Sequence, residues 1–331
     1  MGNLSIPGAT LLSGATFRLA PLPCRARARI HSEYPAIYER NAAWVRRHIP
    51  ESRRQFSDRF PMFDALSYLD AIADRVYQSS CITSLTFACD DLALVEHALF
   101  GDLGRDDGHG WVAAFTSAFG TVEAQMPPKL WKQFHSAWRD WYTATCEENA
   151  LRRARQIPDL DTYLPLRRRS VALDGYLLYL EYALGLTTLT DLRETDPDLD
   201  AVRRHAVDHC MLTNDLYSFR KEASGGEHAN AVSILIAQDR TGSLQTAMDT
   251  LTAMIAHAGQ ALGEASDALQ ERYAGCTEVQ RYVNGLWDFV AANLFWSLDS
   301  PRYSGAGSAW NGLRAAQMVM AQGRTVTIES A

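Results

Sequence analysis

The segment LTNDLYSFRKE, residues 212–222, carries three oxygen-bearing side chains at four-residue spacing. These are Asn214, Ser218 and Glu222, and each four-residue step turns an α-helix by only about 40°. The three side chains therefore line one helical face over two turns. An amide oxygen, a hydroxyl and one carboxylate are hard oxygen ligands that suit Mg²⁺, which also takes water and phosphate oxygens. The neighbouring residues are mostly apolar, which favours a metal site over a solvated polar face, with Lys221 beside it for phosphate.

This face belongs to a helix predicted over residues 195–223, which begins with capping residues and then keeps helical periodicity. Helical patterns also dominate the rest of the chain. They cover residues 34–49, 61–77, 79–100, 111–126, 127–157, 167–184, 242–275 and 277–298. No strand-like alternation and no short repeat interrupts them. The sequence therefore predicts one all-α bundle of about ten helices.

The overall composition excludes several classes of protein. The chain has 331 residues, 47% of them hydrophobic, and a net charge of −7, which gives nucleic-acid binding no electrostatic support. Its six cysteines form no CxxC pair, which favours a reduced, cytoplasmic setting over a disulfide framework. Residues 1–30 lack the pattern of a signal peptide and are interpreted as an N-terminal strap. No apolar stretch approaches the length of a membrane span, so we expect no membrane insertion.

A second group of acidic residues stands upstream, in the apolar run FACDDLALVEH at residues 87–97. Asp90 and Asp91 are adjacent carboxylates, and burying them is costly unless a cation lies on them. A metal cluster and a helix end near solvent are both open interpretations. The pair Asp106-Asp107 has glycine close by on both sides and indicates an exposed turn.

The pattern Asn214-Asp215-x-x-Ser218-x-x-Lys221-Glu222 resembles the NDxxSxxKE metal motif of class I terpene synthases, the bacterial terpene cyclases in particular. The match is complete over nine positions, and Asp90-Asp91 is similar to the first metal motif of that family. The resemblance implies a helical domain over residues 31–310 around a central apolar cavity. It also implies that the two motifs face each other and hold three Mg²⁺ ions on the diphosphate of a linear prenyl diphosphate. Residues 311–331 are then a C-terminal segment that is mobile or caps the active site.

The resemblance also implies specific site residues. Similar bacterial enzymes carry a diphosphate-sensing arginine forty-odd residues before the asparagine, and among three consecutive arginines the spacing favours Arg168. They also carry an Arg-Tyr pair after the last tryptophan-bearing helix, which is Arg302-Tyr303 here. The expected metal ligands are Asp90, Asp91, Asn214, Ser218 and Glu222, and with Arg168 they form the expected catalytic set. The expected diphosphate contacts are Arg168, Lys221, Arg302 and Tyr303.

Two departures from the family pattern affect these expectations. The next acidic residue after Asp91 is Glu96, which lies roughly 120° around the helix from Asp90, so we expect that it is not a ligand. Val171 and Ala172 stand where many bacterial members have Asp and Gly, whose backbone carbonyl helps to trigger ionisation. The carbonyl of Ala172 can still serve in that role.

The implied reaction starts when Mg²⁺ and cationic side chains neutralise a departing diphosphate. The carbocation then cyclises, so that farnesyl or geranylgeranyl diphosphate yields a sesquiterpene or a diterpene. Phe87, Ala172 and Trp296 are expected to line the cavity, where aromatic faces stabilise positive charge by about 1–2 kcal/mol each. A chain-elongating prenyltransferase of the same fold and a non-catalytic isoprenoid-binding protein are the alternatives. The chain length of the substrate, the product, the final base and a possible homodimer are open at this stage.

Overall fold

The computed structural model describes residues 16–51, 54, 59–88, 110–154, 156–225, 229–238, 243–300, 303, 317–320 and 326–329. The helices are α2 (Tyr34–His48), α3 (Phe60–Ser67), α4 (Ala73–Ala88), α6 (Trp111–Glu123), α7 (Pro128–Ala154), α8 (Leu160–Ser170), α9 (Leu173–Leu184), α10 (Leu189–Thr195), α11 (Asp198–Gly225), α12 (Ala231–Gln238), α13 (Leu244–Arg272) and α14 (Thr277–Asp299). The predicted all-α fold class is confirmed. No helix in these ranges is long and apolar enough to span a membrane.

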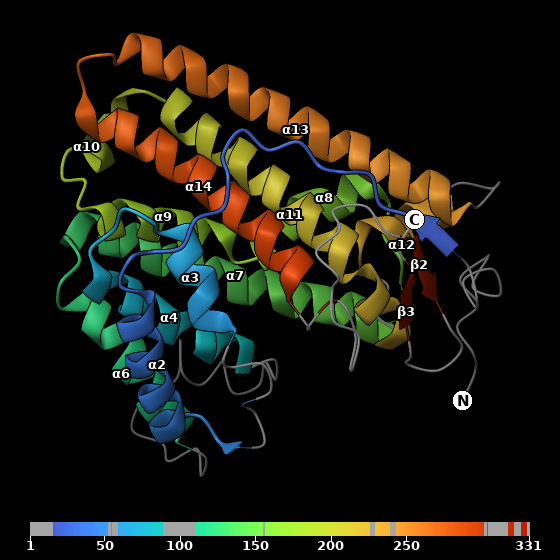
Figure 1. Cartoon of the computed structure of the whole chain (residues 1–331), viewed down its shortest axis with the longest axis horizontal. Coiled ribbons are helices and arrows are strands. Elements are labelled where there is room, and N and C mark those ends of the chain that lie inside the picture. The colour runs from blue at the N-terminus through green and yellow to red at the C-terminus, as the bar shows by residue number, and fades with distance from the viewer. Residues whose placement is uncertain are drawn as a thin grey trace.

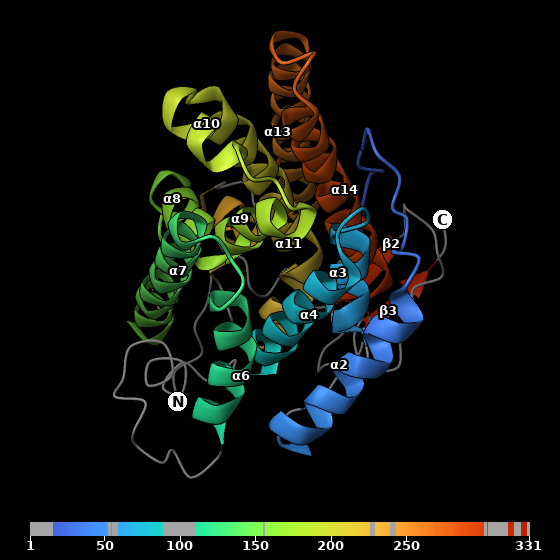
Figure 2. The same ribbon diagram turned by 90° about the vertical axis from the view of Figure 1, so that its left-hand side faces the viewer.

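Helices α9 and α11 lie in the middle of the bundle. Figure 2 shows them between α7 and α8 on one side and α14 on the other, and α11 also packs against α13. Helices α2, α3, α4 and α6 gather at one end, where α3 packs on both α4 and α14 (Figure 1). The predicted metal motif of α11 is therefore carried by an inner helix, with other helices on several sides.

A short antiparallel sheet accompanies the helices. It has the order β1-β2-β3, formed by β1 (Thr16–Arg18), β2 (Gln317–Met320) and β3 (Val326–Glu329), with Phe17 opposite Met318. Strands were not expected from the sequence, and that expectation was wrong. Strands of three or four residues are too short to show alternation against an otherwise helical background.

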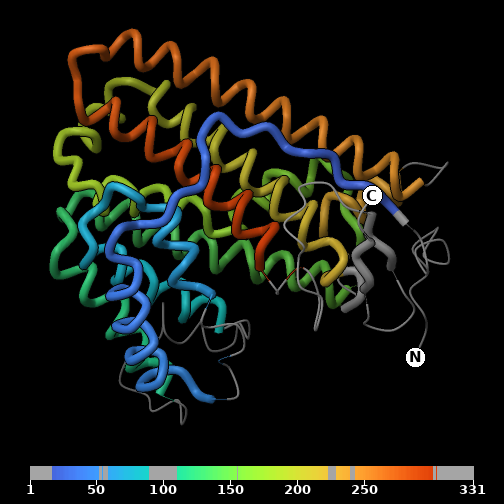
Figure 3. The backbone as a smooth tube through the Cα atoms, in the orientation of Figure 1, coloured from blue at the N-terminus to red at the C-terminus, as the bar shows by residue number. Residues whose placement is uncertain are grey.

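The described part of the predicted strap follows β1 along the outside of the bundle. Figure 3 shows it running over α13 and α14 before it enters α2. The Arg18 amide donates to Gln245 Oε1 at 2.8 Å, and Arg25 and Arg29 pair with Asp267 and Asp288. The division into a strap, a helical domain and a C-terminal segment stays a prediction.

The break between α8 and α9 differs from the predicted one. A single helix was expected over residues 167–184, with a break before it, but α8 already begins at Leu160 and contains Pro165. Asp159 caps α8, since its side chain accepts from the amide of Thr162 at 2.8 Å. The real break is at Ala172, whose φ of 64° is left-handed and ends helical geometry. Similarly, the break predicted near residue 78 lies at residues 68–72, between α3 and α4.

Asp64 is a fully buried acid between α3 and α4. Its Oδ1 accepts from Ser79 Oγ at 2.5 Å and from Thr83 Oγ1 at 3.0 Å, whereas Oδ2 has no hydrogen-bond partner among the residues that the structure describes. Burial raises the pKa of Asp64 to about 7, because the two hydroxyl donors offset only part of the desolvation. The folded state therefore favours the protonated carboxyl.

We expect this carboxyl to make the protein less stable as the pH rises. Its pKa of about 7 in the folded chain exceeds the ordinary 3.8, so its stabilising contribution is complete below pH 4 and is lost as the pH rises through 7. The full loss is on the order of 4 kcal/mol. Asp64→Asn should remove this pH dependence. The free energy of unfolding in urea, taken as the variant minus wild type, should therefore increase from pH 5 to pH 8. Parallel pH curves for the two proteins would contradict the prediction.

Candidate active site

A cavity of about 310 Å³ lies among α4, α7, α8, α9, α11 and α14. Its wall is apolar and aromatic on one part and polar on another. The aromatic part contains Phe63, Phe87, Trp141, Tyr176 and Trp296. The polar part contains Glu148, Arg152, Arg167, Asn214, Lys221 and Glu222. Such a division suits a ligand with one charged end and one hydrocarbon end.

The aromatic wall is packed into a fixed arrangement. Phe87 stacks on Phe60 with ring centroids 4.5 Å apart, and Trp296 lies 5.8 Å from Phe87 and 5.7 Å from Phe63. The Trp296 indole also donates to the Arg59 carbonyl at 3.2 Å, which restricts its rotation. Phe87 and Trp296 thus lie where they were expected, and Ala172 also lines the cavity, at the break before α9.

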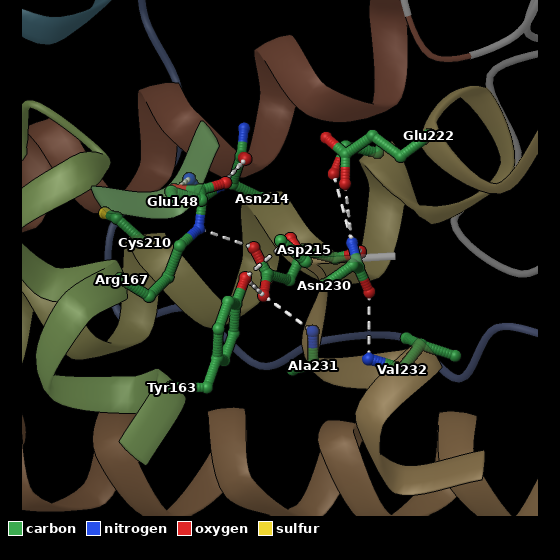
Figure 4. Close-up of polar contacts among 12 residues, drawn as sticks. Glu148, Tyr163, Arg167, Cys210, Asn214, Asp215, Glu222, Asn230, Ala231 and Val232 are labelled. Atoms are coloured by element: carbon green, nitrogen blue, oxygen red, sulfur yellow. Dashed lines mark hydrogen bonds and ion pairs between the residues drawn. The ribbon is translucent and has the colours of Figure 1, made fainter. Parts of the chain in front are cut away.

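The α11 motif presents its two ends to this cavity and buries its middle. Asn214 and Glu222 line the wall, and so does Lys221. The amide of Asn214 accepts from Arg167 Nη2 at 2.7 Å and donates to the Tyr303 hydroxyl at 2.8 Å. Ser218 is only 1% exposed and lies beneath the wall. Asn214 and Glu222 thus lie on the cavity side of α11 (Figure 4), and the third predicted ligand of this helix, Ser218, is buried.

Asp215, the neighbour of Asn214, holds three elements together in the interior. Its Oδ1 accepts from Arg167 Nε at 2.8 Å, and its Oδ2 accepts from the Tyr163 hydroxyl at 2.7 Å and from the Ala231 amide at 2.9 Å. These bonds join α8, α11 and the start of α12 (Figure 4). Burial raises the pKa of Asp215, and the guanidinium of Arg167 opposes that rise.

The three consecutive arginines of α8 diverge, because successive residues of a helix are about 100° apart. Arg167 faces the cavity, with its side chain 12% exposed. Arg168 instead donates to Asp208 twice, from Nε to Oδ1 and from Nη2 to Oδ2. Its side chain does not line the cavity. Arg169 pairs with Asp140 and Glu147 on α7. The structure therefore brings Arg167 to Asn214 in place of Arg168, the arginine that the spacing favoured; a diphosphate contact by Arg168 stays a prediction.

Other predicted residues lie outside the described ranges. These are Asp90, Asp91, Glu96 and Arg302. The expectation that the two metal motifs face each other thus stays a prediction. Tyr303 is described, and it is tied to α11 twice, since its hydroxyl meets Asn214 and its carbonyl accepts from Arg220 Nη2 at 2.8 Å.

Tyr163 and Asn230 were not expected from the sequence as members of this cluster, and Arg167 was considered only as one of three consecutive arginines. Asn230 is fully buried and bonds to Asp215, Ser218 and Glu222. A usable signal was present for it, because an asparagine directly before the apolar run AVSILIAQ is a typical helix N-cap. The contacts of Asn230 with α11 could not be predicted, because a loop separates the two in the sequence and helical spacing does not continue across it.

The donors at this wall fit a divalent metal that is shared with a phosphorylated ligand. No group of three or more His, Cys, Asp or Glu residues that could hold a metal occurs in the part of the chain that the structure describes. The α11 face instead offers an amide oxygen, a hydroxyl and one carboxylate. Such a face carries little negative charge, so phosphate oxygens can complete the coordination. The fold and this face thus combine a helical bundle with an aromatic-walled cavity whose donors suit a divalent metal and a phosphorylated ligand.

Comparison with known proteins identifies the family. The family described as terpene synthase family 2, C-terminal metal binding, matches residues 61–260. Sesquiterpene synthase 6 of Postia placenta is 32% identical over 266 residues, which cover 72% of this chain and 77% of the relative. (E)-2-epi-beta-caryophyllene synthase of Selaginella moellendorffii is 24% identical over 317 residues, which cover 87% of this chain and 86% of the relative.

Solved structures share the fold. Linalool/nerolidol synthase from Streptomyces clavuligerus, in complex with 2-fluorogeranyl diphosphate, is 20% identical, with a TM-score of 0.75 over 86% of this chain and 100% of that chain. The chain belongs to the terpene synthase family, and it is a class I terpene synthase.

Proposed function

We propose that this enzyme uses Mg²⁺ to ionise a linear prenyl diphosphate and cyclises the resulting carbocation, with farnesyl diphosphate as the substrate. The observation that carries the proposal is the division of one cavity wall. Asn214, Glu222, Arg167 and Lys221 belong to its polar part, and the other part contains the aromatic rings of Phe63, Phe87 and Trp296. The names of the relatives, which include sesquiterpene synthases, support a fifteen-carbon substrate. The analogue bound to the linalool/nerolidol synthase supports a prenyl diphosphate.

In this proposal each part of the wall has a separate task. Asn214 and Glu222, with Ser218 behind them, would hold Mg²⁺, which supplies Lewis-acid stabilisation of the departing diphosphate when it is bound. Arg167 and Lys221 donate hydrogen bonds to the diphosphate oxygens as negative charge develops there. The complete metal set would be three ions, with Asp90 and Asp91 as the opposite ligands, and Arg302 and Tyr303 would contact the diphosphate.

The aromatic wall acts after ionisation. Phe87 and Trp296 are fixed by their neighbours, so their ring faces hold a constant position while the hydrocarbon chain folds against them. Their π-systems stabilise migrating positive charge and supply no nucleophile that could capture it. The same rings keep water away from the cation.

One set of incubations tests the proposal. The purified full chain is supplied with C10, C15, C20 or C25 prenyl diphosphate and MgCl₂, with matched EDTA controls, and the products are analysed by gas chromatography with mass spectrometry and by chromatography of diphosphates. We expect a cyclic C15 hydrocarbon or alcohol from farnesyl diphosphate, and none with EDTA. A parallel set of incubations also contains isopentenyl diphosphate, which supplies the five-carbon unit for elongation. A longer diphosphate formed in that set would point to a chain-elongating prenyltransferase. Folded protein that turns over none of the four would favour a non-catalytic isoprenoid-binding protein.

A further inference from the structure

Asn230 lies directly before α12 and is fully buried against the motif-bearing side of α11 (Figure 4). Its Oδ1 accepts from the Val232 amide at 2.8 Å, which is the usual bond of a helix N-cap. This bond also fixes the orientation of the amide group, because the oxygen must face α12. The NH₂ group therefore faces α11.

The NH₂ group has two hydrogens, and α11 supplies acceptors for both. Nδ2 lies 2.8 Å from the Asp215 carbonyl and 2.9 Å from Glu222 Oε2, and the Ser218 hydroxyl oxygen follows at 3.5 Å. One buried side chain thus touches the motif over two turns, from Asp215 to Glu222. A cap alone would need only the Oδ1 bond, so the contacts to the motif are a separate function of the same residue.

We infer that Asn230 is a positioning residue for the metal site: it holds the Glu222 carboxylate in one rotamer through Oε2 and leaves Oε1 for the cation. This inference rests on the proposed function. Without the amide donor, the Glu222 side chain would have to lose its rotamer freedom when the metal binds. Removing a hydrogen-bond partner of a metal-ligating carboxylate typically costs 10–100-fold in metal affinity.

Asn230→Ser separates the two functions, because serine is also a good N-cap but is too short to reach Glu222. Asn230→Thr is a second variant that keeps a cap oxygen and fills more of the space. Asn41→Ser is the matched control. Asn41 is likewise buried and donates to Ser80 and Ser84, between α2 and α4, and it does not line the cavity. Both serine variants thus remove a buried amide, but only Asn230→Ser removes contacts with the α11 motif.

Two readouts are measured on the full chain. Calorimetric titration gives the Mg²⁺ dissociation constant in the presence of inorganic diphosphate, and turnover of farnesyl diphosphate is followed over a range of MgCl₂ concentrations. We expect Asn230→Ser to weaken Mg²⁺ binding roughly 10–100-fold, with most of the turnover restored at saturating MgCl₂. Asn41→Ser should lower stability in urea and leave the Mg²⁺ dependence of wild type unchanged.

Unchanged Mg²⁺ affinity in both Asn230→Ser and Asn230→Thr, beside a wild-type chain that binds Mg²⁺ and diphosphate, would overturn the inference alone. An equal loss of Mg²⁺ affinity in Asn41→Ser would also overturn it, since the effect would then follow from general destabilisation. A wild-type chain that neither binds Mg²⁺ with diphosphate nor turns over any prenyl diphosphate would overturn the proposed function together with the inference.

Discussion

Asn214→Ala should lower the turnover of farnesyl diphosphate by roughly 10²–10³-fold, the loss that follows removal of one stabilising group from a preorganised site. The amide lies at the polar wall of the cavity, between Arg167 on one side and the Tyr303 hydroxyl on the other. Alanine removes the oxygen that would bind the metal, and it also removes the donor that meets Tyr303. Both losses act on the ionisation step, so kcat should fall more than the affinity for substrate.

The measurement is product formation by gas chromatography, with unfolding in urea to confirm that the variant is folded. Asn284→Ala is a matched control, because Asn284 is an exposed amide of α14 that accepts from Gln270 at 3.1 Å and does not line the cavity. It should keep wild-type turnover. Retained turnover in Asn214→Ala, with an unchanged requirement for Mg²⁺, would remove Asn214 from the proposed metal site.

The α11 motif could be predicted from the sequence because it lies within one helix. A helix has a fixed period, so the shared face of Asn214, Ser218 and Glu222 follows from their spacing alone. What the spacing could not give was depth. Ser218 is buried beneath the wall while its two partners line it, and that difference is set by α12 and the buried Asn230 packed against α11.

Relations between elements were harder to predict. The sequence alone does not distinguish three consecutive arginines. The direction of each side chain depends on where α8 begins and on the end of the helical backbone before Ala172. The helix was expected to start at residue 167, whereas α8 already begins at Leu160. The sheet was missed for a related reason, since β1 pairs with β2 from a distant part of the sequence, and such a pairing leaves no local pattern.

Arg167→Ala is expected to lower the free energy of unfolding by about 3–5 kcal/mol, because it leaves the carboxylate of Asp215 buried without its cation. The Asp215 side chain is only 1% exposed, so water cannot replace the guanidinium. Arg168→Ala should cost at most about 1 kcal/mol, since the Arg168 side chain is 40% exposed and its ion pair with Asp208 is partly solvated. Urea unfolding of the two variants at pH 7 measures this contrast.

Asp215→Asn in the Arg167→Ala background tests the cause, because a neutral amide removes the unpaired charge. The double variant should recover part of the lost stability, and no recovery would mean that Arg167 acts through packing instead. Turnover then distinguishes the two arginines in catalysis. Arg167→Lys keeps a cation near Asp215 but replaces the two donor nitrogens that meet Asp215 and Asn214 with a single one, so we expect a larger loss of kcat than in Arg168→Ala. The opposite order would show that the Arg168 guanidinium leaves Asp208 and reaches the diphosphate.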